Sequence, residues 1–141
     1  DAALVHQPDY WPGMQVTQLL EEKLILVRTP QTDTPYIYVD WGSHFRQQHD
    51  ASLPETARPS LAMDLGPLAI QYLLAKGGSG YFRTRVAQPW LEDGSLERVA
   101  NAPEFSYPIF LVHARAKQSP ELLKACDVLQ EALRSTQWSE W

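Results

Sequence analysis

The stretch Tyr36-Ile-Tyr-Val-Asp-Trp-Gly-Ser43 joins a β-branched and aromatic run to a glycine turn and a serine that can cap a helix. It predicts a strand, a turn and a short helix that continues to about Ala51. A second unit of the same kind follows, with a strand at residues 60–63, a turn at 64–66 and a helix that Gly77 stops. Two such units in series favour parallel strands joined by crossover helices, which is an α/β fold.

Further elements are predicted on both sides of these units. Strands are expected at residues 1–5, where the strand should be buried, and at 22–27, 96–100 and 108–114. A short helix near residues 86–92 contains a proline. Ser119, Pro120 and Glu121 provide an N-cap, a first-turn proline and a first-turn acid, so they predict the start of a final amphipathic helix.

Composition limits the functions that are open to the chain. Its 141 residues are 44% hydrophobic and include five tryptophans, so a hydrophobic core can form. With 12 basic and 17 acidic residues the formal charge is −5, which is unfavourable for gripping DNA phosphates. No apolar run approaches the roughly 18 residues of a membrane span, and no signal peptide is evident. We therefore expect a cytoplasmic protein that contacts neither nucleic acid directly nor a membrane.

Nucleophile and phosphate sites are not indicated. Cys126 is the only cysteine, so no intrachain disulfide can form, and its helical spacing predicts a buried small hydrophobe. The glycine-rich residues 77–80 follow a helix and lack the Gly-Lys-Ser/Thr ending of a phosphate-binding loop. They are predicted to end that helix and to let the next strand approach closely.

Metal and acid/base chemistry is not indicated either. His44 and His49 are five residues apart, which places them on different faces of a helix, so a zinc site is not expected. His113 lies in an apolar strand and is predicted to be a hydrogen-bonded core or edge residue. The adjacent acids at 21–22 and 92–93 lie beside turns, where carboxylates are usually solvated. We predict no enzyme activity, no metal and no cofactor.

The two turns that follow the strands are the best candidates for a ligand site. Residues 41–43 and 64–66 place backbone N–H groups and helix N-termini at the carboxyl ends of strands. Open α/β sheets bind ligands at that edge, and such a site suits a small anion or polar metabolite.

Several segments, in this order, resemble one family. The helix ending Leu73-Leu-Ala-Lys-Gly-Gly78 with the strand Ser79-Gly-Tyr-Phe82, and the turn Leu91-Glu-Asp-Gly-Ser-Leu96, are similar to motifs of the effector domains of bacterial LysR-type transcriptional regulators. Residues 1–5 and 20–27 look like two of the family's strands. The resemblance extends over nearly the whole chain.

This resemblance implies a type-2 periplasmic-binding-protein-like fold of two Rossmann-like lobes with a small-molecule effector between them. Residues 1–29 would be part of lobe I, residues 30–115 the complete lobe II, and residues 116–141 the return to lobe I. The intact regulator would be a homodimer or tetramer. It would bind DNA only through an N-terminal domain that these 141 residues do not include.

Eight residues occupy the positions that the resemblance assigns to the effector site. They are His6, Gln7, Trp41, Gly42, Ser43, Asp64, Leu65 and Gly66. Structural roles are open for several of them: turn geometry for the two glycines, a helix cap for Asp64 and packing for Trp41.

Three other functions remain open. An exported solute-binding protein of the same fold would be favoured by an export signal upstream of Asp1. An enzyme of Rossmann-like architecture would need a catalytic group that the sequence does not show. The segment could also serve chiefly in assembly, through exposed helices and strand edges.

Overall fold

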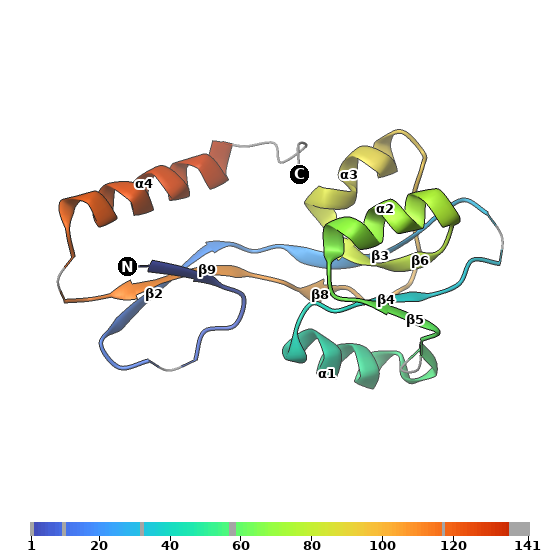
Figure 1. Ribbon diagram of the computed structural model, residues 1–141, viewed down its shortest axis with the longest axis horizontal. Coiled ribbons are helices and arrows are strands. Elements are labelled where there is room, and N and C mark those ends of the chain that lie inside the picture. Colours follow the sequence, from blue (N-terminus) through green and yellow to red (C-terminus); the bar gives the residue numbers. More distant parts are fainter. Residues whose placement is uncertain (1, 10, 32, 57–58, 117, 136–141) are drawn as a thin grey trace. The chain divides into compact units, whose positions relative to one another are not determined.

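The chain forms two compact units in a computed structural model that describes residues 2–9, 11–31, 33–56, 59–116 and 118–135 (Figure 1). The first unit contains the chain up to Glu22 and again from Ser106, and the second contains Lys23–Phe105. The predicted lobe boundaries, after residues 29 and 115, lie several residues further along the chain than these two crossings. The assignment of residues to lobes stays a prediction.

The first unit is built on a three-stranded antiparallel sheet. Strands β1 (Ala2–Val5) and β2 (Met14–Leu20) pair with opposite edges of β9 (Ile109–Ala114), in the order β1-β9-β2. Central β9 carries the buried residues, Leu111, Val112 and His113. The predicted burial of residues 1–5 is wrong, because β1 is an edge strand in the described part of the chain and its Leu4 is 55% exposed.

Helix α4 (Pro120–Ser135) completes the first unit and contacts β2. The Ser119 hydroxyl accepts a hydrogen bond from the Leu122 N–H at 3.1 Å, so the predicted N-cap is confirmed. Cys126 and Leu133 are seven residues apart and both buried. The prediction that Cys126 is a buried small hydrophobe is also confirmed.

The second unit contains the two predicted strand-turn-helix units. Strands β4 (Ile37–Val39) and β5 (Leu61–Met63) are parallel neighbours. An antiparallel sheet has the order β6 (Ser79–Arg83), β3 (Lys23–Arg28), β7 (Glu97–Arg98), and β8 (Phe105–Ser106) also pairs with β3. A parallel bridge between Tyr36 and Ser79 links the two sheets. The predicted parallel strands are therefore confirmed.

Helices cover both faces of these strands. Helix α1 (Ser43–Ser52) lies on one side, and α2 (Gly66–Lys76) and α3 (Thr84–Glu92) lie on the other (Figure 1). A short 3-10 helix (Pro54–Thr56) follows α1. The expected serine cap of α1 is wrong: Gly42 is the N-cap, and no side chain caps this helix. Gly42 has φ 103°, a conformation that glycine tolerates, so the helix already begins at Ser43.

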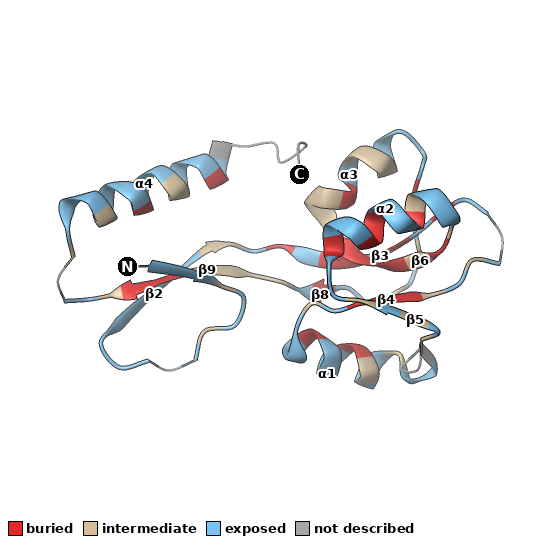
Figure 2. Cartoon of the chain, in the orientation of Figure 1, coloured by how far each residue is buried: buried red, intermediate tan, exposed pale blue. Residues whose placement is uncertain are grey.

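The hydrophobic core of the second unit lies between its strands and the pair α2 and α3. In Figure 2 the buried residues concentrate in the strands and on the inner sides of the helices. Burying each large apolar side chain contributes about 1.5–3 kcal/mol. The core residues are Ile25, Val27, Ile37, Val39, Ala69, Ile70, Leu73, Phe82, Ala87 and Leu96.

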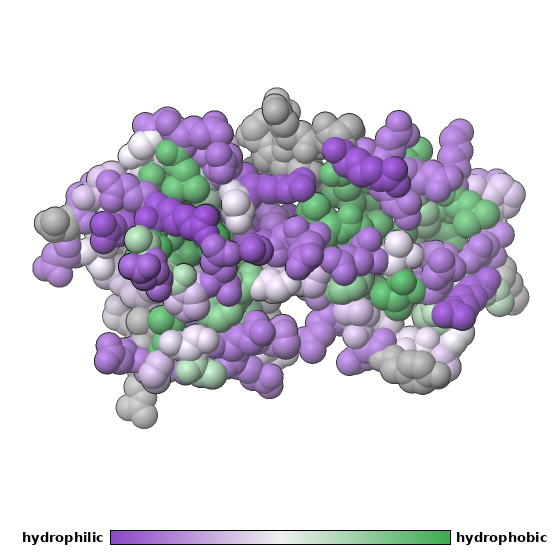
Figure 3. All heavy atoms as spheres, turned by 180° about the vertical axis from the view of Figure 1, so that it is seen from behind, coloured by the Kyte–Doolittle hydropathy of each residue, from purple (hydrophilic) through white to green (hydrophobic). Residues whose placement is uncertain are grey.

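The surface also carries hydrophobic residues, in both units. Figure 3 shows them as separate green patches among hydrophilic residues on the face seen from behind. Among the described residues, the large hydrophobic side chains that are exposed are those of Leu4, Trp11, Met14, Val16, Leu65, Leu68, Tyr72, Leu123 and Val128.

Candidate functional site

The carboxyl ends of β4 and β5 lie side by side in the second unit. Val39 pairs with Met63 in parallel register, and the Asp40 N–H donates a hydrogen bond to the Met63 carbonyl at 2.7 Å. Both strands therefore end at the same edge, where α1 and α2 begin. Helix N-termini carry partial positive charge, and this edge of an α/β sheet is a common place for ligands.

Trp41 contacts the start of α2 at this edge. Its indole N–H donates to the Tyr81 carbonyl at 2.9 Å, and its ring meets Phe82 edge-on with centroids 6.5 Å apart. A Cβ added at Gly66 would lie 2.6 Å from Cη2 of the indole. Gly66 therefore allows the indole to lie against α2, which supports the packing role considered for Trp41.

Gly42 and Ser43 form the entry to α1. The Gly42 N–H donates to Oδ1 of Asp40 at 2.9 Å, so this carboxylate stabilises the turn. A Cβ at Gly42 would meet no atom within 4 Å, and its φ of 103° is therefore the reason for glycine. Ser43 is exposed as the first residue of α1.

Asp64 and Leu65 are exposed at the entry to α2, and Leu65 is 59% exposed. Leu65 occupies the N-cap position, and no side chain caps α2. The structural role considered for Asp64, as the cap of this helix, is therefore wrong. Both side chains are exposed directly before α2.

His6 and Gln7 belong to the first unit. The His6 ring stacks on Tyr107 with centroids 4.0 Å apart, and its Nδ1 lies 3.0 Å from the Pro108 carbonyl oxygen, which accepts the hydrogen bond. Gln7 is exposed. Six of the eight predicted residues therefore lie at the entries to α1 and α2 in the second unit, whereas His6 and Gln7 lie in the first.

A buried polar network beneath α1 was not foreseen. His49 is fully buried, with Nε2 2.7 Å from the Tyr36 hydroxyl and Nδ1 2.8 Å from Oδ1 of Asp50. A carboxylate only accepts hydrogen bonds, so Nδ1 donates to Asp50, and Nε2 accepts from the Tyr36 hydroxyl. Burial raises the pKa of Tyr36, which keeps its hydroxyl protonated as a donor.

The surroundings of this network are aromatic. Tyr38, Phe45, Tyr81 and Phe105 make ring contacts with one another or with His49. Burial also raises the pKa of Tyr81 to about 12. The signal in the sequence is the spacing of Phe45 and His49, four residues apart on one face of α1. His44 is exposed, so the prediction that the two histidines lie on different faces is confirmed.

The glycine-rich segment after α2 has the predicted structural role. Gly77 ends the helix with φ 78°. A Cβ at Gly78 would come within 3.1 Å of Ile37, Leu73 and the Pro35 carbonyl, because β6 enters next to β4. His113 is buried, and its Nδ1 lies 3.1 Å from the Ala114 carbonyl oxygen, as expected of a hydrogen-bonded strand residue.

A solvent-open groove of about 470 Å³ lies elsewhere, along α3 and β7. Its polar side chains bond among themselves or to neighbours, as Gln88 does to Glu92 and Arg98 to Glu104. The edge at α1 and α2 remains the better candidate, because two helices begin there. The groove is lined by Gln88, Leu91, Glu92, Gly94, Leu96, Glu97 and Arg98.

The described residues contain no group of three or more His, Cys, Asp or Glu side chains that could hold a metal ion. None of the helices among them is long and apolar enough to cross a membrane.

The fold is that of the regulatory domains of LysR-type transcriptional regulators, a type-2 periplasmic-binding-protein-like fold. The family model of the LysR substrate binding domain matches residues 1–134. The chain therefore belongs to the LysR substrate-binding domain family, as its resemblance to that family indicated. The comparison with curated proteins gave no match.

Solved structures share the fold at low sequence identity. The regulatory domain of HypT from Salmonella typhimurium has a TM-score of 0.76 at 12% identity, covering 96% of this chain and 74% of that one. Full-length LysG from Corynebacterium glutamicum has 0.66 at 16%, covering 94% and 50%. ArgP from Mycobacterium tuberculosis has 0.65 at 20%, covering 95% and 48%. The chain thus spans about half the length of the LysG and ArgP chains.

Proposed function

We propose that the chain is the effector-sensing part of a LysR-type transcriptional regulator, and that a small anionic or polar molecule binds at the carboxyl edge of β4 and β5. The observation that carries the proposal is that α1 and α2 both begin at this edge, with Trp41 packed against Gly66. Backbone N–H groups at helix N-termini favour negative charge. Family membership supports a regulator over an exported solute-binding protein or an enzyme.

The contact residues would come from the two turns, Trp41 to Ser43 and Asp64 to Gly66. His6 and Gln7 are proposed as the contribution of the first unit. Related structures do not point to one effector: a LysG structure has bound effector Arg, whereas HypT is a hypochlorite-specific regulator. The test below therefore uses a panel of compounds.

In the whole protein, the effector would change the geometry of the regulatory domain and so the way in which the DNA-binding domain meets its operator. A ligand shifts such an equilibrium by its difference in affinity for the two states. The whole regulator would act in the cytoplasm as a homodimer or tetramer, and DNA would be bound only by its N-terminal domain.

A thermal-shift panel of amino acids and small organic and inorganic anions tests the proposal on the 141-residue chain. Ser43→Glu adds a negative charge at the N-terminus of α1, and we expect it to weaken binding of an anionic hit about tenfold, an effect of about 1.4 kcal/mol. The matched control is Ser52→Glu, at the other end of the same helix, which should leave affinity unchanged.

The control separates ligand binding from helix stability. An acid stabilises the N-terminus of a helix and slightly destabilises its C-terminus, so loss of binding only in Ser43→Glu cannot come from a weakened α1. A hit that binds Ser43→Glu as tightly as the unmodified chain would place the ligand elsewhere and contradict the proposal. So would a panel without any hit.

A further inference from the structure

The chain passes between its two units at Glu22/Lys23 and again at Phe105/Ser106. These two crossing segments are joined to each other by backbone hydrogen bonds. Strand β8 pairs with β3, and the Tyr107 N–H donates a hydrogen bond to the Glu22 carbonyl at 2.6 Å. The two segments therefore pass the boundary as a pair of strands.

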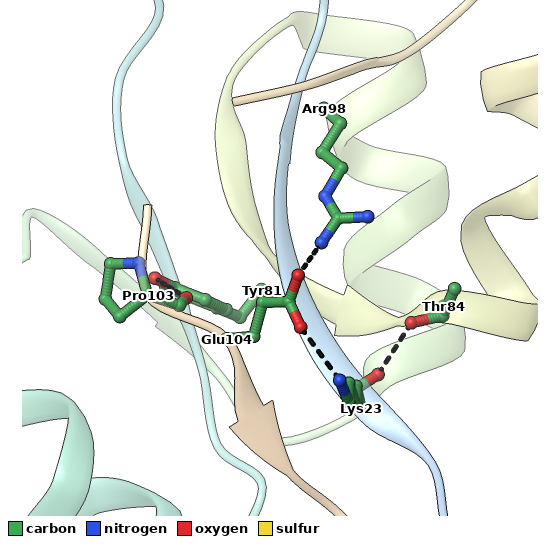
Figure 4. A network of polar contacts seen from close by, with 6 residues as sticks. All are labelled: Lys23, Tyr81, Thr84, Arg98, Pro103 and Glu104. Atoms are coloured by element: carbon green, nitrogen blue, oxygen red, sulfur yellow. Dashed lines mark hydrogen bonds and ion pairs between the residues drawn. The ribbon is translucent and has the colours of Figure 1, made fainter. Parts of the chain in front are cut away.

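Side chains tie this pair to the second unit. Oε2 of Glu104 lies 3.2 Å from Nζ of Lys23, and its Oε1 accepts from Nη2 of Arg98 (Figure 4). Lys23 is the first residue of the second unit and Glu104 is next to its last residue. One carboxylate thus joins the incoming segment, the outgoing segment and β7.

A backbone carbonyl of each crossing segment also accepts a hydrogen bond from a side chain of the second unit. The Thr84 hydroxyl, at the start of α3, donates to the Lys23 carbonyl at 3.1 Å. The hydroxyl of the buried Tyr81, on β6, donates to the Pro103 carbonyl at 2.9 Å (Figure 4). Both crossing segments are therefore anchored where they meet the second unit, by residues of three different elements.

The exposure of their side chains determines how strongly these ion pairs can stabilise the crossing segments. The side chains of Lys23 and Glu104 are 59% and 39% exposed, so an isolated pair would add little. A carboxylate shared between two cations forms a network, which holds geometry better than a single pair does. On the other side of the boundary, β2 changes register between Gln18 and Leu20, an irregularity that bends a strand.

We propose that Lys23, Arg98 and Glu104 form the fixed end of a hinge. The network holds both crossing segments against the second unit, so any reorientation of the units takes place about residues 18–22 and 106–108. Its regulatory consequence rests on the proposed function: the stiffness of the hinge limits how far an effector can change the geometry of the domain.

Distance measurements by double electron–electron resonance test the hinge without any effector. Spin labels are placed at Gln15→Cys on β2 and Gln71→Cys on α2, both exposed, in a Cys126→Ala background diluted with unlabelled protein. Glu104→Gln removes the shared charge, and we expect a broader distribution of distances between the labels. Lys23→Gln, a second variant, should broaden it too, and high salt should broaden the distribution of the parent chain.

The matched control is Glu97→Gln. Glu97 pairs with Arg28 at 3.5 Å across the same strands, with similar exposure, but away from the crossing. This control should keep the parent distribution. Unchanged distributions for Glu104→Gln and Lys23→Gln, or equal broadening by Glu97→Gln, would overturn the hinge. Since no ligand is used, these outcomes leave the effector site to its own test, and circular dichroism checks that each variant is folded.

Discussion

Replacing Gly66 by alanine perturbs the contact between α2 and the indole of Trp41. The added Cβ would lie 2.6 Å from Cη2 and 3.2 Å from Cζ2 of that ring. Carbon atoms pack best at about 3.5–4.0 Å, so the ring must retreat by roughly 1 Å. The hydrogen bond from its Nε1 to the Tyr81 carbonyl, now 2.9 Å, opposes that movement.

The expected loss of stability follows from two opposing effects. Overpacking a well-packed contact costs about 1–3 kcal/mol. Alanine is favoured over glycine in a helix by up to about 1 kcal/mol. We therefore expect Gly66→Ala to lower the free energy of unfolding by about 1–2 kcal/mol.

A double-mutant cycle with Trp41→Phe isolates the contact. The smaller ring does not reach the new Cβ, so Gly66→Ala should be neutral or stabilising in that background. Urea unfolding followed by circular dichroism gives the four free energies, and NMR of the Trp41 indole N–H reports the displacement of the ring. Two results would refute the reasoning. Gly66→Ala could leave the free energy of unfolding unchanged when Trp41 is present, or it could lower that free energy equally in the parent and Trp41→Phe backgrounds.

Two further predictions concern the aromatic residues beneath α1. Tyr36→Phe leaves Nε2 of buried His49 without its donor and should lower the free energy of unfolding by about 1–3 kcal/mol in urea titrations; an unchanged value would contradict the network. Tyr81 has its pKa raised from 10.0 to about 12, so the folded state retains a proton that the unfolded state releases. Stability should therefore fall as pH rises from 10.0 towards 12, and a Tyr81→Phe variant that falls as steeply would exclude this tyrosine as the cause.

Local signals in the sequence predict much of the second unit. The β-branched and aromatic run before Trp41 and the glycine that ends α2 each act within a few residues of the element they define. The cap at Ser119 is a signal of the same kind in the first unit. Such signals can be recognised in the sequence without knowing which residues pack against the helix or strand. They led to the two strand-turn-helix units and to the edge where α1 and α2 begin.

Elements that depend on distant partners were missed or misjudged. Strand β2 (Met14–Leu20) was not predicted, because it pairs with β9 about ninety residues later in the chain. The burial of β1 was misjudged because the apolar residues 2–5 say nothing about whether a strand lies at an edge. The network at His49 needs Tyr36 from another element, and spacing within α1 alone could not reveal it. The eight predicted ligand contacts stay a prediction.

The two faces of β4 should differ in how freely their residues can vary among related chains. Ile37 and Val39 face other aliphatic side chains, where exchanges that conserve volume usually cost less than about 1.5 kcal/mol. Tyr36 and Tyr38 point the opposite way, where a hydrogen bond and ring edges determine which side of α1 meets the sheet. Substitutions at Ile37 and Val39 would leave the orientation of α1 unchanged. Substitutions at Tyr36 and Tyr38 would let α1 turn about its axis, and so change the direction in which Ser43 points.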